Sequence, residues 1–168
     1  KLRTGSEGEE NKQHRTLLLS AAAGGRVDLV NSLLERWQHD VPWLRRLIDE
    51  SHVLPLSAGA GHVQVVIALL TIPNIDVNTL RSGSTPLAEA ASNGHIGVMN
   101  ELLHTRGIDI NRQCTDSGAT PLVQACYKGN IVIVERLLSQ PSIDVNRSTI
   151  NQRAPLHVAC LEDPLYLW

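Results

Sequence analysis

The tetrapeptide Ile75-Asp76-Val77-Asn78 recurs as Ile108-Asp109-Ile110-Asn111 and again as Ile143-Asp144-Val145-Asn146, in steps of 33 and 35 residues. A fixed period of this length is typical of proteins built from stacked repeats. Such units bury their apolar faces against one another and present an extended surface. The period therefore predicts a chain that holds a partner, and it makes catalysis the less favoured interpretation.

Other residues follow the same period, which shows that the tetrapeptide does not recur by chance. Four glycines share one repeat position, and two leucines follow each of them eight and nine residues later: Gly25, Gly61, Gly94 and Gly129. Eight residues before the glycine stands Pro86 in the third unit and Pro121 in the fourth. A further unit opens at Pro155 and is incomplete. We therefore expect about four full repeats and a partial fifth.

The third and fourth repeats begin with the signature of a helix start. Thr85-Pro86-Leu87 and Thr120-Pro121-Leu122 place threonine where it can accept a hydrogen bond from an unpaired amide, and proline where no hydrogen bond is lost. This first helix is predicted to end at Asn93-Gly94 or Lys128-Gly129, because glycine adopts the left-handed turn readily. Small residues on it, such as Ala91, allow neighbouring layers to approach closely.

A second helix is predicted to follow directly. In the fourth unit it begins near Asn130, and four apolar residues fall on one stripe at helical spacing, which we expect to be buried between layers: Ile131, Val134, Leu137 and Leu138. After the paired leucines, the recurring tetrapeptide and the turn glycines Gly83 and Gly118 predict a hairpin-like projection. The expected order is helix, turn, helix and projecting loop.

With Thr-Pro-Leu, the glycine, the paired leucines and Asp-Val-Asn in one register, the units resemble ankyrin repeats. The resemblance covers about Thr16 to Cys160 and is most specific in the third and fourth units. It implies an all-α solenoid, a stack of helix-turn-helix units joined by hairpin-like loops. We expect a flexible leader or cloning remnant over 1–15, followed by a repeat domain over 16–168 with units at about 16–51, 52–84, 85–119 and 120–153 and a partial unit at 154–168.

The junction between the first two units departs most from this pattern. The tetrapeptide is absent there, and Pro42 is followed by apolar residues at helical spacing up to Ile48, which predicts a short amphipathic helix in place of the hairpin. Trp37 and Trp43 either fasten this helix to the stack or expose an aromatic anchor for a partner. The basic residues nearby are either a solvated face or a site for acidic groups: Arg36, Arg45 and Arg46.

Composition excludes several classes of function. The chain has 168 residues, a formal net charge of −2 and a sequence pI near 6.4, so it lacks the clustered positive charge that binds a phosphate backbone. Its apolar runs are far shorter than the roughly 20 residues that a membrane span needs. We therefore expect neither nucleic-acid binding nor membrane insertion.

The cysteines and histidines carry no pattern of a metal or catalytic site. Cys114, Cys126 and Cys160 form no CxxC pair, so we expect free thiols in a reducing, cytoplasmic setting. Cys126 and Cys160 are predicted to be small buried residues, and Cys114 is expected near an exposed loop tip. His62 and His95 follow the turn glycine, where the resemblance makes them structural. We expect no enzyme activity, no metal and no cofactor.

The resemblance implies that a protein or peptide docks on a concave face formed by loop tips and first helices. The positions that would contact it are Arg81, Ser82, Ser84, Ser92, Asn93, Arg112, Asp116, Ser117, Ala119, Tyr127, Lys128, Arg147, Ile150, Asn151 and Arg153. Tyr127 is the preferred hot spot, with a half-buried packing role as the equally weighted alternative.

Two other functions remain open at this stage. The repeats are alternatively a substrate-recruiting module of a larger enzyme, or part of a bacterial protein delivered into the host cytoplasm. The resemblance also implies a second role for Asn78, Asn111 or Asn146, as the acceptor of a hydroxyl group from an asparagine hydroxylase. Stabilisation of the hairpin explains these asparagines equally well. At the C-terminus, Leu165 to Trp168 either fold back as a cap or belong to a fragment of a longer chain, and we favour the fragment.

Overall fold

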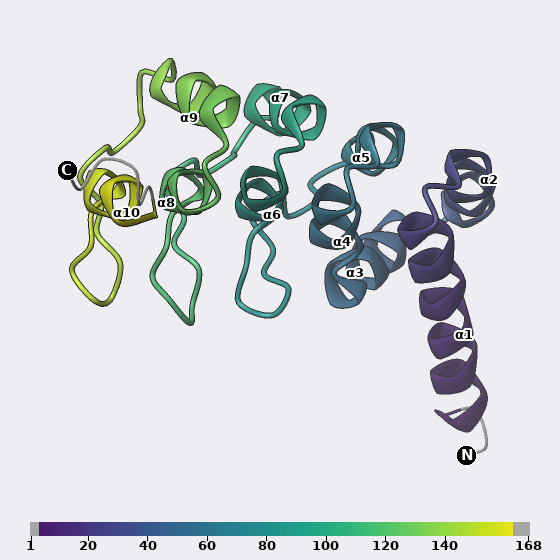
Figure 1. Cartoon of the computed structure of the whole chain (residues 1–168). Helices are drawn as coiled ribbons and strands as arrows, with labels where there is room; N and C mark the ends of the chain where they lie inside the picture. The colour runs from purple at the N-terminus through teal and green to yellow at the C-terminus, as the bar shows by residue number, and fades with distance from the viewer. Residues whose placement is uncertain (1–3, 163–168) are drawn as a thin grey trace.

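The computed structural model describes residues 4–162, and the side chains of residues 11–160. Within this range the chain forms ten α-helices and no strand (Figure 1). Their bounds are α1 Thr4–Ala23, α2 Val27–Trp37, α3 Val41–Ser51, α4 Val53–Gly59, α5 Val63–Leu70, α6 Pro86–Asn93, α7 Ile96–His104, α8 Pro121–Tyr127, α9 Ile131–Leu138 and α10 Pro155–Glu162.

The helices form two parallel rows, as predicted for a repeat stack. The first helices α4, α6, α8 and α10 contact one another in chain order, and the second helices α2, α5, α7 and α9 form the other row (Figure 1). Each second helix also packs on the first helix of its own unit. The predicted α-solenoid is therefore confirmed.

The predicted helix starts and stops are confirmed in the third and fourth units. The Thr85 hydroxyl accepts a hydrogen bond from the Ala88 amide at 3.1 Å, and Thr120 does the same for Val123 at 3.3 Å. These bonds satisfy amides that the helix itself leaves unpaired. Helix α6 ends at Gly94, whose φ of 75° lies in the left-handed region.

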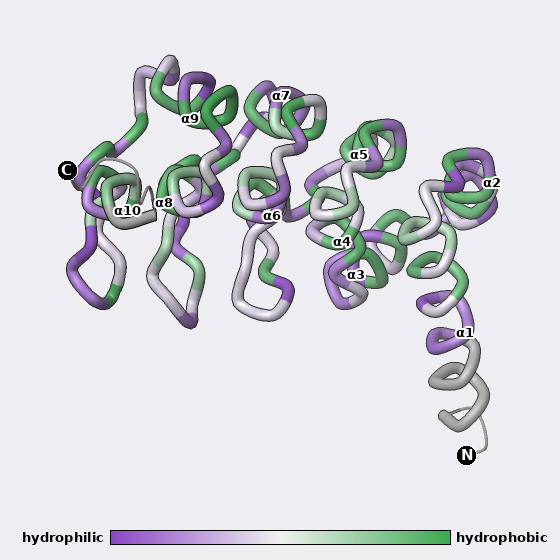
Figure 2. The backbone as a smooth tube through the Cα atoms, viewed as in Figure 1, coloured by the Kyte–Doolittle hydropathy of each residue, from purple (hydrophilic) through white to green (hydrophobic). Residues whose placement is uncertain are grey.

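One continuous apolar core runs from Leu18 in α1 to Leu137 in α9. Ala88, Ala90 and Ala91 on α6 are fully buried, which confirms that small side chains let the layers approach closely. Hydropathy follows the same division, since hydrophobic segments lie along the helices and hydrophilic or neutral segments dominate the loop tips (Figure 2).

The recurring tetrapeptide joins neighbouring units and is not itself a hairpin. The Asn78 side chain donates to the Gly107 carbonyl and accepts from the Asp109 amide, both at 2.8 Å. Asn111 repeats this pattern toward Ser142 and Asp144, again at 2.8 Å. Within residues 4–162 the one isolated β-bridge, between Arg81 and Ser84, lies farther along the loop. These asparagines therefore form a ladder between units.

A second ladder lies beside the turn glycines. His62 Nε2 hydrogen-bonds the Ala23 carbonyl at 2.9 Å, and His95 Nε2 hydrogen-bonds the Gly59 carbonyl at 3.0 Å. Asn130 takes the equivalent position in the fourth unit and donates to the Ala91 carbonyl at 2.8 Å. The structural role predicted for His62 and His95 is therefore confirmed.

The prediction of a flexible leader over 1–15 is wrong for its helical part. Helix α1 begins at Thr4 and passes through Thr16 without a new start. Residues 9–15 contain good helix formers and no proline, so nothing in them stops a helix. Asn11 also accepts a hydrogen bond from the Trp43 indole at 3.0 Å. The predictions for residues 163–168 lie outside the described residues.

The predicted amphipathic helix of the first junction is α3. The Asp40 side chain caps it by accepting from the Trp43 amide at 3.0 Å. Trp37 is 8% exposed, and its ring lies 5.8 Å from that of Trp43, with His14 edge-on to both. The tryptophans thus fasten α1, α2 and α3 together, which confirms the structural interpretation over the exposed anchor.

The expected burial of the α9 stripe is wrong in part. Leu137 is fully buried, but Ile131 is 70% and Leu138 49% exposed, while Ile133 is 2% exposed. The described residues end with α10 at Glu162, and within them α7 is the one second helix that contacts α9. Burial of this stripe requires a neighbour on both sides.

Two of the cysteine predictions also fail. Cys114 is buried and close to Ser84, with 3.7 Å between its sulfur and the Ser84 hydroxyl oxygen, instead of being exposed at a loop tip. Cys160 is exposed, because no described element covers that side of α10. Cys126 is half-buried as a small packing residue, and all three are free thiols.

Candidate protein-binding surface

The loops that precede α6, α8 and α10 project to the same side of the stack (Figure 1). We call this side the loop-tip surface, made of residues 79–84, 112–119 and 147–153 together with the last turns of α6 and α8. Every residue predicted to contact a partner lies on it. The repeat period places equivalent positions of the three loops side by side.

Hydrogen bonds between successive loops hold the loop-tip surface in one arrangement. The Thr115 amide donates to the Gly83 carbonyl at 2.9 Å, and the Ile150 amide donates to the Ser117 carbonyl at 3.1 Å. The Gln113 side chain donates to its own loop and, at 3.0 Å, to the Ser148 carbonyl of the next. A surface ordered in advance loses less entropy when it binds.

A cavity of about 270 Å³ opens on this surface between α8, α10 and the two loops before them. Apolar side chains from both helices line its floor, and polar side chains from the loops line its rim. Five of its lining residues were predicted as contacts: Ser117, Ala119, Tyr127, Asn151 and Arg153. A concave, mostly apolar site with a few polar groups is the usual form of a binding pocket.

Tyr127 and Arg153 are the two large side chains at the rim of this cavity. Tyr127 is 51% exposed, and the Lys128 ammonium lies 5.4 Å from the centre of its ring. The exposed Arg153 guanidinium forms no hydrogen bond or ion pair within residues 11–160, whose two ion pairs both lie on α3. The cavity thus combines an aromatic face with an unpaired cation.

The structure separates the predicted contact residues by exposure. Ala119 is buried, at 4% exposed, and contributes only to the cavity floor. Three others are half-buried: Ser84, Ser92 and Ser117. The exposed residues are Arg81, Ser82, Asn93, Arg112, Asp116, Tyr127, Lys128, Arg147, Ile150, Asn151 and Arg153.

Four lining residues of the cavity were missed by the sequence analysis: Val123, Gln124, Thr149 and Val158. Gln124 precedes Tyr127 by three residues on α8, and residues at this spacing share a helix face. That spacing could have identified Gln124. Val123 and Val158 face each other only because α8 and α10 stack, so no local pattern marks them.

The loop-tip surface differs in charge from the chain as a whole. Among the fifteen predicted contacts, five are basic and one, Asp116, is acidic, although the chain has a formal net charge of −2. The basic side chains are Arg81, Arg112, Lys128, Arg147 and Arg153. A concentration of one sign of charge attracts a partner of the opposite sign.

Comparison with known families now decides what the chain is. A family model described as ankyrin repeats in three copies matches residues 18–114, and a second model, described as ankyrin repeat, matches residues 117–150. The chain belongs to the ankyrin repeat family. Members of this family generally serve as modules for protein–protein interaction. A search of curated proteins finds no match.

Residues 4–162 contain no group of three or more His, Cys, Asp or Glu side chains placed to hold a metal ion. Burial raises the pKa of the Cys126 thiol, which disfavours the thiolate that a nucleophile requires. None of the described helices has the length and apolar character needed to cross a bilayer.

Proposed function

We propose that this ankyrin stack binds an acidic segment of a partner protein along the loop-tip surface. The cavity between α8 and α10 carries the proposal, because it places the Tyr127 ring, an unpaired Arg153 guanidinium and an apolar floor together. The bonds between the loops support it by ordering this surface before the partner arrives. An aromatic residue and an arginine are the side chains most often found at binding hot spots.

In this proposal an apolar side chain of the partner enters the cavity, and acidic residues beside it meet Arg153 and the other basic loop residues. The chain acts as a binding module without a catalytic centre of its own. Three free thiols, one of them exposed, favour a reducing intracellular compartment. Recruitment of a substrate to an enzyme would use the same surface in the same way.

The test is affinity capture with the purified chain, followed by measured affinities for each retained protein. Tyr127→Ala and Arg153→Glu should each weaken binding about tenfold or more, as expected for hot-spot residues. Arg106→Glu is the matched control, since Arg106 is exposed but lies outside the loop-tip surface. If both cavity variants bind a retained protein as tightly as the control does, the loop-tip surface is not its site.

A further inference from the structure

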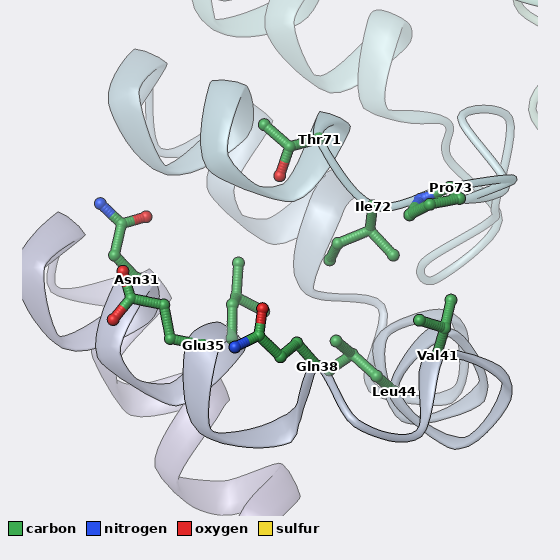
Figure 3. A pocket seen from close by; sticks show the side chains of 9 residues that line it. Asn31, Glu35, Gln38, Val41, Leu44, Thr71, Ile72 and Pro73 are labelled. Carbon is green, nitrogen blue, oxygen red and sulfur yellow. The ribbon is translucent and has the colours of Figure 1, made fainter.

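A second hollow lies away from the loop-tip surface, where α2, α3 and the chain leaving α5 meet (Figure 3). Its volume is about 340 Å³. The floor is formed by Leu34, Leu44 and Ile72, which are 9%, 3% and 7% exposed. None of its lining residues belongs to a loop tip or to a first helix, so it is separate from the surface proposed above.

The hollow is a consequence of the insertion in the first junction. In the later units the chain that follows a second helix enters the loop that leads to the next repeat. After α2 the chain instead forms α3, which supplies Val41 and Leu44 to the hollow. Val41 is 38% exposed at the edge, although the floor beneath it is closed. An apolar side chain could therefore be buried here without any rearrangement of the core.

The electrostatics of the hollow favour a cation. Glu35 is the one charged side chain in its lining, and it forms no ion pair within residues 11–160, whose side chains are described. Two helix C-termini also converge on it, because Gln38 is the C-cap of α2 and Thr71 the C-cap of α5, and both residues line the hollow. A helix C-terminus carries about half a negative charge. The N-terminus of α3 at Val41 carries an opposite partial charge, but it is capped by the Asp40 carboxylate, so Glu35 and the two C-termini leave the potential around the apolar floor negative.

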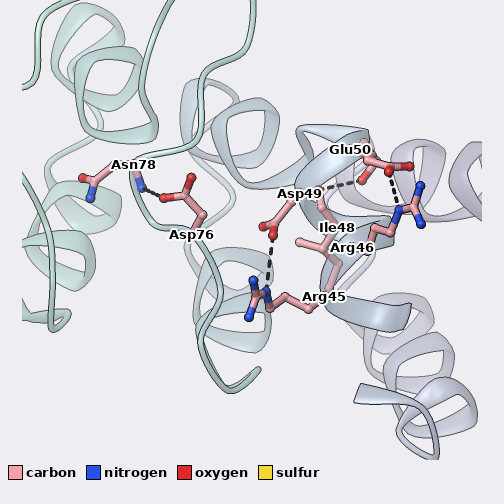
Figure 4. A network of polar contacts seen from close by, with 8 residues as sticks. Arg45, Arg46, Ile48, Asp49, Glu50, Asp76 and Asn78 are labelled. Atoms are coloured by element: carbon pink, nitrogen blue, oxygen red, sulfur yellow. Dashed lines mark hydrogen bonds and ion pairs between the residues drawn. The ribbon is translucent and has the colours of Figure 1, made fainter. Parts of the chain in front are cut away.

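The shape of the site favours an extended occupant. A neighbouring hollow of about 460 Å³ shares Val41 and Pro73 with the first and continues along α3 to Glu50. Its basic residues are already neutralised, since Arg45 and Arg46 pair with Asp49 and Glu50 (Figure 4). The two hollows together form what we call the insertion groove.

Polar groups at the edge of the insertion groove suit a peptide backbone. The side-chain amides of Asn31 and Gln38 make no hydrogen bond within the described part of the chain, and each can both donate and accept. In Figure 3 the Asn31, Glu35 and Gln38 side chains lie along α2, opposite Thr71 and Ile72. This edge can therefore bond main-chain groups beside the apolar floor.

We propose that the insertion groove is a second docking site, which binds a short extended peptide segment with an aliphatic side chain next to a lysine or arginine. The aliphatic side chain packs on Leu34, Leu44 and Ile72. The basic side chain reaches Glu35 and the C-terminus of α2. This preference is opposite in charge to that of the loop-tip surface, so the two sites select different partners.

The test begins with random seven-residue peptides displayed on phage and selected for binding to the purified chain. Phage that also bind the Glu35→Lys variant are discarded, because their peptides bind elsewhere on the chain. The enriched sequences should share an aliphatic residue beside a lysine or arginine. One enriched peptide, made synthetically with a fluorophore, is then titrated by fluorescence anisotropy. Glu35→Lys should weaken its binding about tenfold or more and Glu35→Gln about threefold, because a favourable charge contact is reversed or removed.

Arg153→Glu is the matched control and should leave the affinity of this peptide unchanged. Circular dichroism of both Glu35 variants checks that they fold, as expected for an exposed helical position. The proposal is overturned if no peptide is enriched, if the enriched peptides lack a basic residue, or if Arg153→Glu abolishes binding instead. It is also overturned if the unmodified chain dimerises in solution and Val41→Asp makes it monomeric, since the occupant is then a second copy.

Discussion

The Asp49 carboxylate on the inserted helix α3 pairs with Arg45 at 3.7 Å, while its other oxygen is buried and has no hydrogen-bond partner within residues 11–160. In the later units the side chains of Asn78 and Asn111 accept hydrogen bonds from the amides of Asp109 and Asp144. Asp49 lies close enough to Asp76, which matches Asp109 and Asp144 in the repeat, for the backbone amide and the charge of Asp76 to affect the pKa of its carboxyl. Figure 4 shows its side chain between α3 and the segment that carries Asp76.

Replacing Asp49 by asparagine should stabilise the protein at neutral pH. Burial is the main cause that raises the pKa of the Asp49 carboxyl, and the nearby Asp76 charge adds to it. The folded chain thus holds the proton more tightly than the unfolded chain, so the stabilising contribution of the protonated form is present in acid and lost as the pH rises through the folded pKa. Asp49→Asn keeps the acceptor without the charge.

Urea denaturation at a series of pH values measures this effect. At pH 7 the free energy of unfolding of Asp49→Asn should exceed that of the natural sequence by less than about 1 kcal/mol, because the site is partly solvated. The difference should vanish below pH ~4, where aspartate is protonated in both states. Glu50→Gln, which breaks an exposed pair on the same helix, should change little. A less stable Asp49→Asn protein at pH 7 would contradict this account.

The asparagine ladder can be tested with a pair of equivalent residues. Asn111→Ala removes two side-chain hydrogen bonds to the next unit and should lower the free energy of unfolding by about 1–2 kcal/mol. Asn146 occupies the same repeat position but is exposed, and its side chain makes no hydrogen bond within residues 11–160. Asn146→Ala should therefore be nearly neutral in the same thermal and urea denaturation. Equal losses in both variants would rule out the ladder as the source of stability.

Alanine substitutions at the turn glycines Gly61 and Gly129 separate the cost of backbone strain from the cost of steric contact. Gly61 has a φ of +77°, and a Cβ added to it would lie 2.7 Å from the His95 ring. Gly129 has a φ of +66°, but a Cβ there meets nothing within 4 Å. Gly129→Ala should cost about 1 kcal/mol of stability from the left-handed backbone alone. Gly61→Ala should cost more, because the His95 ring must move and its bond to the Gly59 carbonyl is lost.

A double-mutant cycle isolates the contact with the His95 ring. In a His95→Ala background, Gly61→Ala should cost no more than Gly129→Ala does in the natural sequence. Thermal denaturation of the four proteins supplies the comparison. If the extra cost of Gly61→Ala persists without the histidine, its cause lies in the backbone and not in the ladder.

The three thiols should react with a disulfide reagent in the order Cys160, Cys126, Cys114. Cys160 is exposed, Cys126 is half-buried with a pKa raised by burial, and Cys114 is 6% exposed. Reaction requires an accessible thiolate, so the fast phase belongs to Cys160. Cys160→Ser should remove that phase in a spectrophotometric assay at pH 7.5. If a fast phase remains in Cys160→Ser, then Cys126 or Cys114 is more accessible to the reagent than its burial in the structure indicates.

Local patterns in the sequence predicted most of the fold. Thr85 and Thr120 mark helix starts, Gly94 marks a helix end, and Pro42 marks the inserted helix, because caps and breakers act within a few residues. The loop-tip surface follows from the same register, although its role as a binding site is still a proposal. The repeat register alone does not predict that Ala119 is buried while Tyr127 lines a cavity.

The sequence by itself determined the repeat period, the two-helix unit and the order of the units, because these depend on residues close together in the chain. Only the tertiary structure decided that Ile131 is exposed, that Cys114 is buried and that Trp37 packs against Trp43. Each of these depends on which neighbouring layer covers a side chain, and that contact joins residues far apart in the sequence.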